Sequence, residues 1–388
     1  MQITRLAPSP TGALHLGNAR TFLVNWLLAR QKGWKIILRI EDLDGPRIKR
    51  GADQQAIQDL RWLEIDWDQG PIYQSSRMAL YREAIDSLVS RGLAYPCICT
   101  RKEAALAASA PHAEDGASVY PGTCRGRFRS IEEARAAAGG REPAVRFVVS
   151  SNPVEFDDGF RGRVRFKDPA AELGDFVIAK ADGTPAYQLA VVVDDADMQI
   201  TQIVRGDDLL DSTPRQVLLY HALNLSEKMP HYTHLPLVVG PDGRRLAKRH
   251  GDTRISHYRE LGVPAEKILA LMARWCALIP SSGEPGGPTP FERPVDLQNS
   301  SAIPRPSPYP GERMGEGPER KLRRAAPHPA SPPSTGTRSS IPCAQHVSEQ
   351  VPGEAVMESR LRGLLSAFDL KRIPPTPIIM SPDDEPRA

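Results

Sequence analysis

Residues 1 to 42 place a segment of helical periodicity between two apolar runs, and this pattern restricts the fold more than any other feature. The runs "MQITRLA" and "WKIILRIED" predict two short buried strands. Between them Leu16, Ala19, Leu23, Trp26 and Leu27 recur at the spacing of one helix face. The chain is therefore expected to begin with a strand-helix-strand unit, as α/β proteins do.

The same alternation returns in the second half of the chain. Residues 188–195 ("QLAVVVDD") and 200–208 ("ITQIVRGDD") are rich in β-branched residues and predict strands. A helix is expected from about Thr213 to Leu223, followed by another apolar run in "HLPLVVG". We therefore expect an α/β fold with an open, mostly parallel sheet that helices cover. The stretch from about Ala94 to Lys167 breaks the alternation and predicts an insertion between the halves of the sheet.

Length and charge exclude several classes of protein. The 388 residues suffice for two or three domains, and a net charge of +3 is too small for a chain that coats nucleic acid. No run approaches the roughly 20 apolar residues that span a bilayer, and a signal-peptide pattern is absent. We therefore expect a cytoplasmic protein without membrane contact. From Pro280 to about Pro352 about one residue in five is proline, which is typical of disordered segments.

The turn before the first helix places a His-x-Gly step, His15 to Gly17, where that helix begins. The first N–H groups of a helix lack partners within it and carry the positive end of the dipole, so they suit a phosphate. Gly17 permits close approach, and His15 adds a donor. The alternative is an ordinary helix start with a satisfied histidine. The sequence has neither a Walker A loop nor a G-x-G-x-x-G loop, so the usual phosphate-binding loops are absent.

Five motifs follow one another in order: "RLAPSPTGALHLGNAR", "LRIEDLD", "AYQLAVVVDD", "IVRGDD" and "RRLAKRHGD". Together they resemble the class I aminoacyl-tRNA synthetases of the glutamyl type, over about residues 1–279 and again from near 358. The resemblance implies a Rossmann-like catalytic domain in two parts with an inserted domain between them. The implied segments are 1–93 and 169–251 for the catalytic domain, 94–168 for the insertion, 252–279 for a helical stem-contact segment, 280–356 for the Pro-rich insertion and 357–388 for a closing helix and tail.

The resemblance implies a glutamate pocket made by Arg5, Ser9, Glu41, Tyr187 and Arg205. The chemistry agrees, because planar guanidinium groups suit the two carboxylates of glutamate and a carboxylate suits its ammonium group. Which arginine takes which carboxylate stays open. Outside this ordered context, each residue would be interpreted as a surface or ion-pairing residue.

The resemblance places ATP at the start of the first helix, with His15, Gly17, Asn18 and Lys248 as binding residues. Of these, His15, Gly17 and Lys248 are the implied catalytic residues. Activation of a carboxylate requires alignment with the α-phosphate and stabilisation of the leaving pyrophosphate, and little acid-base chemistry. Mg²⁺ is expected to bind through the oxygens of ATP.

The loop that carries Lys248 departs from the pattern of the family. Where the glutamyl type commonly has Lys-Leu-Ser-Lys-Arg, this chain has Arg245 in place of the first lysine and Ala247 in place of the serine. Positive charge is kept, but one hydrogen-bonding hydroxyl is lost. Slower activation is one expected consequence, and an ordinary basic surface loop is the alternative interpretation.

Three of the five cysteines lie between positions 97 and 124. A chain of this length does not depend on a disulfide framework, so metal ligation is considered before oxidation. Cys97, Cys99 and Cys124 offer three thiolates to a tetrahedral Zn²⁺. The resemblance implies Tyr120 as the fourth ligand, whereas His112 competes because imidazole is the commoner zinc ligand. Reduced cysteines without a metal are the remaining alternative.

The end of the chain distinguishes between members of the family. A full glutamyl-tRNA synthetase continues into a large helical domain that reads the anticodon, and no segment after residue 279 is expected to serve as one. The stretch "LLSAFDLKRIPPTPIIMSPDD" resembles the end of the family's short paralogues. That likeness implies ATP-dependent activation of L-glutamate and its transfer to the queuosine base at the wobble position of tRNA(Asp).

The expected partners are therefore L-glutamate and the anticodon stem-loop of tRNA(Asp), with no obligate protein partner. Arg125, Arg127 and Arg129 are candidates for contacts with RNA phosphates, or form a solvated basic face. A truncated glutamyl-tRNA synthetase that charges the 3' end of tRNA is the first alternative function. A catalytically weak paralogue that binds ATP or RNA is the second.

Overall fold

The expected strand-helix-strand unit opens the structure. The computed structural model describes residues 1–100, 102–103, 119–244, 246, 251–277, 364–365, 368–380, 384 and 386. Strand β1 (Ile3–Leu6), helix α1 (Leu16–Lys32) and strand β2 (Lys35–Ile40) follow one another, and β1 is parallel to β2. Helix α1 ends at Gly33, whose left-handed conformation (φ 65°) turns the chain back into β2. The prediction made from the apolar spacing is confirmed.

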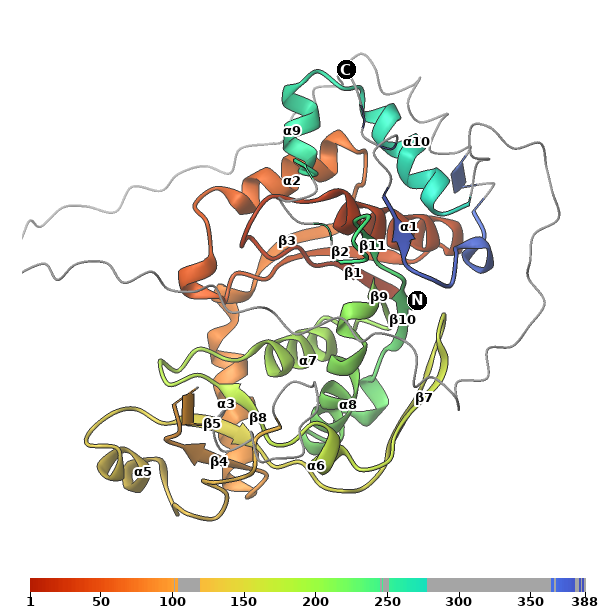
Figure 1. The fold of residues 1–388 in the computed structure, drawn as a ribbon. Coiled ribbons are helices and arrows are strands. Elements are labelled where there is room, and N and C mark those ends of the chain that lie inside the picture. The colour runs from red at the N-terminus through yellow and green to blue at the C-terminus, as the bar shows by residue number, and fades with distance from the viewer. Residues whose placement is uncertain are drawn as a thin grey trace, which may run out of the picture.

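The parallel strands of both halves of the chain form one open layer. Strand β3 (Gln69–Tyr73) pairs with β2, and β9 (Gln202–Gly206) pairs with β10 (His231–Leu235), in both cases parallel. The two groups adjoin where Thr201, just before β9, donates its N–H to the carbonyl of Ile3 at 2.9 Å. Figure 1 shows β3, β2, β1, β9 and β10 across the middle of the molecule. The expected α/β class with a mostly parallel sheet is confirmed.

Apolar side chains alternate between the two faces of this layer. Ile36, Leu38 and Ile40 pack with α1, α2 (Ala52–Trp62) and α10 (Ala265–Trp275). Ile37 instead packs in a separate cluster with residues of β9 and β10. The sheet is therefore buried on both faces, as a parallel sheet in an α/β protein must be.

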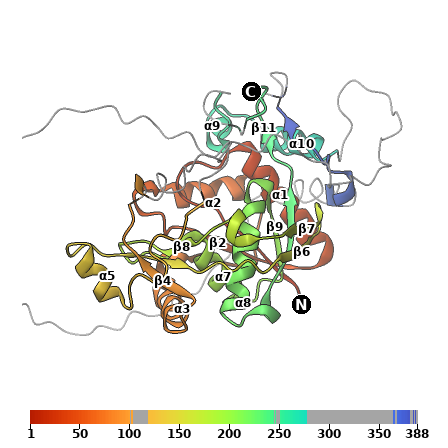
Figure 2. The ribbon, with the colours of Figure 1, turned by 60° about the horizontal axis from the view of Figure 1, so that its bottom comes forward.

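The prediction of a strand at residues 188–195 is wrong. These residues lie in helix α7 (Tyr187–Asp197), which packs against α3 (Met78–Ser90) and α8 (Thr213–Ala222). The helix is buried on nearly every side from Leu189 to Ala196, so its sequence lacks the polar positions that reveal helical periodicity. Burial between neighbouring elements overrides the strand preference of three consecutive valines. Figures 1 and 2 show α7 and α8 on the side of the sheet opposite to α1 and α2.

A small antiparallel sheet forms the first part of the expected insertion. Strand β4 (Ala94–Cys97) pairs with β5 (Ala144–Phe147), which pairs with β8 (Phe176–Ala179). Helix α5 (Ile131–Ala137) lies beside them and begins at Ser130, whose side chain accepts a hydrogen bond from the third residue of the helix. Strand β8 lies beyond the expected boundary at residue 168, so that boundary does not coincide with the edge of this sheet.

The second part of the expected insertion is a hairpin that joins the large sheet. Strands β6 (Val154–Asp158) and β7 (Gly162–Phe166) are antiparallel, and β6 adds to β10 through the pair Tyr232 and Asp158. Figure 2 shows this hairpin and the small sheet at opposite ends of the molecule. Asp158 is thereby brought to the side of β10.

The last described residues return to the core around α1. Strand β12 (Ile378–Ile379) pairs in parallel with β11 (Val238–Val239). Phe368, Ile373 and Met380 are buried in the same cluster as α1 and α10. The Pro-rich segment and the greater part of the expected closing helix lie outside the described residues.

Two further α-helices are short, α6 (Pro169–Glu172) and α9 (Ile255–Glu260). Helix α9 follows the loop that was expected to contact ATP and packs on α2. Within the described ranges, no helix combines the length and the apolar character that crossing a membrane requires.

The contact between α2 and α9 buries a carboxyl group. Asp59 of α2 is fully buried, accepts a hydrogen bond from Gln55 at 2.9 Å and lies 3.5 Å from the guanidinium of Arg259 on α9. Its Oδ2 atom has no hydrogen-bond partner among the described residues. Burial raises the pKa of Asp59 to about 6, although Gln55 and Arg259 oppose the shift and Glu260 adds to it.

This raised pKa predicts how stability depends on pH. The folded state binds the proton of Asp59 more tightly than the unfolded state, so stability is highest below about pH 4 and falls as the pH rises through about 6. The substitution Asp59→Asn removes that loss, which we expect to amount to about 2 kcal/mol between pH 4.5 and 7.5. The free energy of unfolding of this variant, measured by thermal unfolding between pH 4.5 and 7.5, should depend less on pH than that of the wild type. Exposed Asp86→Asn is the control, and parallel curves for Asp59→Asn and wild type would contradict the prediction.

Candidate active site

Charged residues predicted from the sequence meet at the carboxyl ends of the parallel strands. Arg5 lies in β1, Glu41 directly follows β2, and Arg205 lies in β9; all three are buried. They are close enough to interact: burial lowers the pKa of Arg5, Asp195 and Glu41 raise it, and Arg205 lowers it further. The structure therefore brings Arg5, Glu41 and Arg205 into one cluster.

The other two predicted pocket residues lie at the edge of this cluster. Tyr187 is the first residue of α7, interacts electrostatically with Glu41, Arg205 and Arg5, and keeps 38% of its surface exposed. Ser9 is exposed in the turn after β1. The N–H of Glu41 donates to the carbonyl of Pro8 at 3.1 Å, which fixes this turn beside the cluster.

Sequence reasoning missed the arginine at the centre of the cluster. Arg39 of β2 is fully buried, and its guanidinium contacts Asp195 at 2.6 Å and Glu41 at 3.0 Å. Asp195 also lies 3.7 Å from the Nε atom of Arg5. Part of this network was detectable, since residues 39 and 41 must share one face of a strand. Asp195 was not, because its segment was predicted as a strand.

The same cluster contains buried polar atoms that lack hydrogen-bond partners among the described residues. They are the Nε atoms of Arg5 and Arg39 and the hydroxyl groups of Tyr220 and Tyr232. Both tyrosines interact electrostatically with Asp195 and Arg5. A buried polar atom without a partner costs about 1 to 3 kcal/mol, so water or a polar ligand must satisfy such a group.

Two guanidinium groups of the cluster are suited to the carboxylates of a ligand. Three guanidinium groups, those of Arg5, Arg39 and Arg205, lie with three carboxylates, those of Glu41, Asp195 and Asp194, and Arg77 also contacts Asp194. Burial raises the pKa of Glu41, while the neighbouring arginines Arg39 and Arg5 oppose that shift. Arg5 and Arg205 donate no hydrogen bond to a carboxylate within the described residues, so they are the groups that suit an anionic ligand.

Arg205 is held by neutral acceptors. Its Nε atom donates to Nε2 of His234 at 3.0 Å, and its Nη2 atom donates to Thr213 at 2.7 Å and Gln216 at 2.9 Å. The guanidinium also lies 5.2 Å from the ring centre of Tyr232. These contacts fix the plane of the guanidinium group.

The predicted phosphate site at the start of α1 is hydrogen-bonded to the residues that follow the loop carrying Lys248. His15 precedes the first turn of α1, and its Nδ1 atom lies 3.2 Å from the hydroxyl of Thr253. The N–H of Leu16 donates to the carbonyl of Thr253, and the N–H of Ile255 donates to Leu14. The N–H groups of Gly17 and Asn18 have no acceptor among the described residues, as a phosphate site at a helix start requires.

The loop residues themselves lie outside the described residues. This applies to Lys248, Arg245 and Ala247. The described chain resumes at Gly251, and residues 253 to 255 are bonded to the start of α1.

The cysteine cluster has the geometry of a tetrahedral metal site. The Sγ atoms of Cys97, Cys99 and Cys124 all lie within 4.8 Å of one another, and those of Cys99 and Cys124 are 3.5 Å apart. The hydroxyl of Tyr120 lies 3.4 Å from the Sγ atoms of both Cys97 and Cys99. Thiolates around one Zn²⁺ are about 3.8 Å apart, so the four groups fit this ion. His112 lies outside the described residues.

A cation covers one side of this cluster. The guanidinium of Arg146 lies 3.7 Å from the ring centre of Tyr120, and its Nε atom is 3.3 Å from the Sγ atom of Cys97. Three thiolates and a phenol around a divalent cation carry excess negative charge. Arg146 is placed to offset that charge.

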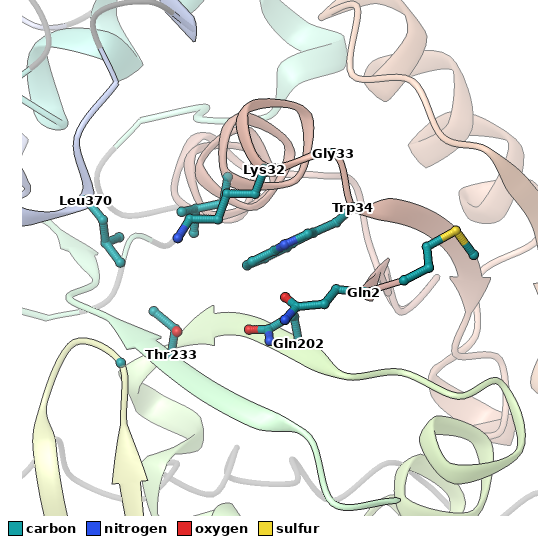
Figure 3. Close-up of a pocket in the computed structure, with 10 residues that line it drawn as sticks. Gln2, Lys32, Gly33, Trp34, Gln202, Thr233 and Leu370 are labelled. Atoms are coloured by element: carbon teal, nitrogen blue, oxygen red, sulfur yellow. The ribbon is translucent and has the colours of Figure 1, made fainter.

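The cavity of about 690 Å³ at the other edge of the sheet does not involve the predicted site residues. It lies where β1, β2 and β9 begin, and Gln2, Lys32, Trp34 and Gln202 contribute to its walls. Figure 3 shows the ring of Trp34 between Lys32 and the amide groups of Gln2 and Gln202. Ligands of open α/β sheets bind at the carboxyl ends of the strands, so the buried charged cluster remains the candidate active site.

Comparison with known proteins agrees with this geometry. Residues 2–283 match the family model described as tRNA synthetases class I (E and Q), catalytic domain. A protein named Glutamyl-Q tRNA(Asp) synthetase from Rhodopirellula baltica is 50% identical over 291 residues, which are 72% of this chain and 86% of the relative. A Glutamate--tRNA ligase from Citrifermentans bemidjiense is 41% identical over 271 residues, but the match spans only 56% of that relative.

A solved structure shows the same fold. The glutamate tRNA ligase from Elizabethkingia meningosepticum, crystallised in complex with its amino acid, superposes with a TM-score of 0.60 at 30% sequence identity. The match covers 70% of this chain and 60% of that ligase, so the chain spans less than two thirds of the longer enzyme. On the sequence, the fold and the charged cluster together, the chain belongs to the class I tRNA synthetase (E and Q) family.

Proposed function

We propose that this protein activates L-glutamate with ATP and transfers it to the queuosine base at the wobble position of tRNA(Asp). One observation carries the proposal: the buried cluster of Arg5, Arg39, Arg205, Glu41 and Asp195 at the carboxyl ends of the strands. Arg5 and Arg205 complement the two carboxylates of glutamate, and Glu41 complements its ammonium group. A neutral amino acid lacks the second carboxylate for which this arrangement provides.

In the proposed complex, Arg205 and Arg5 face the two carboxylates, and Glu41 accepts from the ammonium group. The unpartnered hydroxyl groups of Tyr220 and Tyr232 supply further polar contacts around the ligand. Tyr187 and Ser9 bound the pocket on its solvent side.

Activation joins a carboxylate oxygen of glutamate to the α-phosphorus of ATP and releases pyrophosphate. The N–H groups of Gly17 and Asn18 bind phosphate oxygens at the positive end of α1, beside His15. Lys248 stabilises the leaving pyrophosphate and contributes on the order of 3 kcal/mol to the transition state. Mg²⁺, bound through the oxygens of ATP, neutralises part of the phosphate charge. The hydroxyl missing at Ala247 makes this step slower than in a loop with serine.

The choice of acceptor rests on the pattern of likeness. The relative named for tRNA(Asp) is more similar and is covered over 86% of its length, against 56% for the Glutamate--tRNA ligase. Of the arginines considered for RNA contacts, Arg125 donates to Asp175 at 2.8 Å and is already paired. Arg127 and Arg129 are better placed to bind RNA phosphates, since both are largely exposed.

Charging of a tRNA 3' end is the second candidate function. The 41% identity with a Glutamate--tRNA ligase favours it, because the glutamate and ATP chemistry would be the same. The two functions differ only in the nucleophile that attacks the activated glutamate.

Glutamate-dependent exchange between ATP and pyrophosphate, measured without tRNA, tests activation. We expect exchange by the wild type, and a loss of at least about 100-fold for Arg205→Met, because a buried charge-assisted contact is removed. The exposed Arg82→Met variant is the matched control and should keep wild-type exchange. No exchange by the wild type with any amino acid would contradict activation and leave a binding paralogue.

Transfer of labelled glutamate tests the acceptor. We expect labelling of tRNA(Asp) that contains queuosine and none of tRNA(Asp) that lacks it. Because the queuosine base lies in the anticodon and not at the 3' end, removal of the 3'-terminal adenosine should not prevent labelling. Labelling of tRNA(Glu), abolished by removal of its 3'-terminal adenosine, would establish the second candidate instead.

We further propose that Cys97, Cys99, Cys124 and Tyr120 hold a structural Zn²⁺. The ion would fix β4 to the loop before α5 and supply no step of the reaction. The convergence of the Tyr120 hydroxyl on two thiols favours it over His112 as fourth ligand.

Metal analysis of the purified protein tests this site. We expect about one zinc ion per chain, lost in Cys124→Ser and held more weakly in Tyr120→Phe during competition with a chelator. His112→Ala should keep the metal, as should Cys276→Ala, a buried cysteine outside the cluster. Loss of zinc from His112→Ala but not from Tyr120→Phe would assign the fourth ligand to the histidine.

A further inference from the structure

A buried histidine lies between the arginine of the candidate pocket and a carboxylate from another strand. His234 of β10 is fully buried, and its Nδ1 atom lies 2.6 Å from Oδ2 of Asp158 at the end of β6. Its Nε2 atom accepts from Nε of Arg205 at 3.0 Å. The sequence offered no sign of this contact, since His234 was part of an expected apolar run.

The hydrogen bonds determine the tautomer of His234. An arginine nitrogen only donates, so Nε2 of the ring must be the unprotonated acceptor. The proton is then on Nδ1 and is donated to Asp158. The carboxylate itself is fixed by backbone N–H groups: those of Phe160 (3.0 Å) and Arg161 (2.8 Å) donate to Oδ1, and that of His234 is shared between Oδ1 (3.2 Å) and Oδ2 (3.1 Å).

The environment keeps the ring neutral and the carboxylate ionised. Burial lowers the pKa of His234, and the charges of Arg205 and Arg161 lower it further against the effect of Asp158. Burial acts to raise the pKa of Asp158, but the hydrogen bonds from His234 and the backbone bring it below its usual value. Both states agree with the donors and acceptors described above.

A neutral acceptor has a different effect on Arg205 than a carboxylate would. His234, Thr213 and Gln216 fix the guanidinium, and within the described residues no carboxylate lies in ion-pair contact with it. Arg39, by contrast, contacts Glu41 and Asp195 directly. A carboxylate bound to Arg205 would compete with an anionic ligand for its N–H groups. Because the imidazole of His234 lies between them, Asp158 does not compete for the N–H groups of Arg205.

We propose that Asp158 and His234 are positioning residues that orient Arg205 through a neutral imidazole and leave its charge free for a carboxylate of the substrate. The inference rests on the proposed function, in which Arg205 binds glutamate. Asp158 and His234 act through Arg205 and do not touch the substrate. The hairpin of β6 and β7 thereby becomes a support of the pocket.

Asp158→Asn is the decisive substitution. The N–H groups of Phe160 and Arg161, which donate to Oδ1 alone, hold the amide oxygen in that place, so the amide NH₂ faces Nδ1 of His234. The ring must then accept at Nδ1 and carry its proton on Nε2, directly opposite the N–H of Arg205. Two donors face each other, and Arg205 is displaced although the volume of the side chain is unchanged.

Steady-state exchange kinetics measure the consequence. For Asp158→Asn and for His234→Leu we expect the KM for glutamate to rise about 10- to 100-fold, as for other lost partners of a binding group. The KM for ATP should stay within about twofold, because the helix start is not touched. His234→Gln restores an acceptor near Nε2 and should recover most of the affinity for glutamate. Asp59→Asn, another buried carboxyl change, is the matched control and should leave both values unchanged.

Nitrogen NMR of the wild-type protein with ¹⁵N-labelled histidine tests the geometry without any substrate. His234, assigned by the signal lost in His234→Gln, should show Nδ1 protonated and Nε2 unprotonated at neutral pH. Asp158→Asn should invert this tautomer.

The two measurements separate the possible failures. Protonation of Nε2 in the wild type, an unchanged KM for glutamate in both variants, or an equal rise of both KM values would overturn the positioning role. If the wild type shows no glutamate-dependent exchange, the proposed function fails, and a positioning role for a glutamate-binding Arg205 fails with it. The NMR result then shows whether a neutral His234 still accepts from Arg205 and donates to Asp158.

Discussion

The buried guanidinium of Arg39 is the constraint on which the arrangement of the two halves depends. A charge without water is stable only when it is paired, and an unpaired one costs several kcal/mol. Its partners are Glu41, which directly follows the same strand, and Asp194 and Asp195 on α7, the latter 156 residues away. Helix α7 must therefore pack where its last turn meets β2, and this contact also brings Asp195 to Arg5. The ion pairs specify the geometry of the pocket more than they stabilise the fold.

The parts of the fold that could be predicted were those with a distinct local period. Helix α1 has apolar residues on one face and Gly33 at its end, so its extent followed from the sequence. Helix α7 offered no such contrast, because Leu189 to Ala196 are buried from nearly every side. A short apolar run is compatible with either a strand or a fully buried helix, and only the neighbouring α3 and α8 decide between them. The division of residues 94 to 179 between two sheets likewise depends on long-range pairing.

The residues of the candidate site likewise fall into those that the sequence could indicate and those that it could not. Arg5, Glu41, Tyr187 and Arg205 were proposed from the order of motifs, and the structure brings these four together, while their roles remain predictions. The residues that orient them have no local signature. Asp158 and His234 are separated by 76 residues, and their contact exists only because β6 adds to β10. Sequence patterns identify residues that a family uses, whereas the partners that fix those residues depend on tertiary packing.

The described residues on either side of positions 278–363 pack on one core, and this bears on how the protein can change. Helix α10 ends at Trp275, and Leu364 and Phe368 pack on the same core. Both flanks are thus anchored independently, and the entropic cost of joining two fixed points of a chain rises only slowly with the number of residues between them. Evolution can lengthen, shorten or replace that stretch at little cost to the catalytic core. It is accordingly the position at which the chain would best accept a grafted domain.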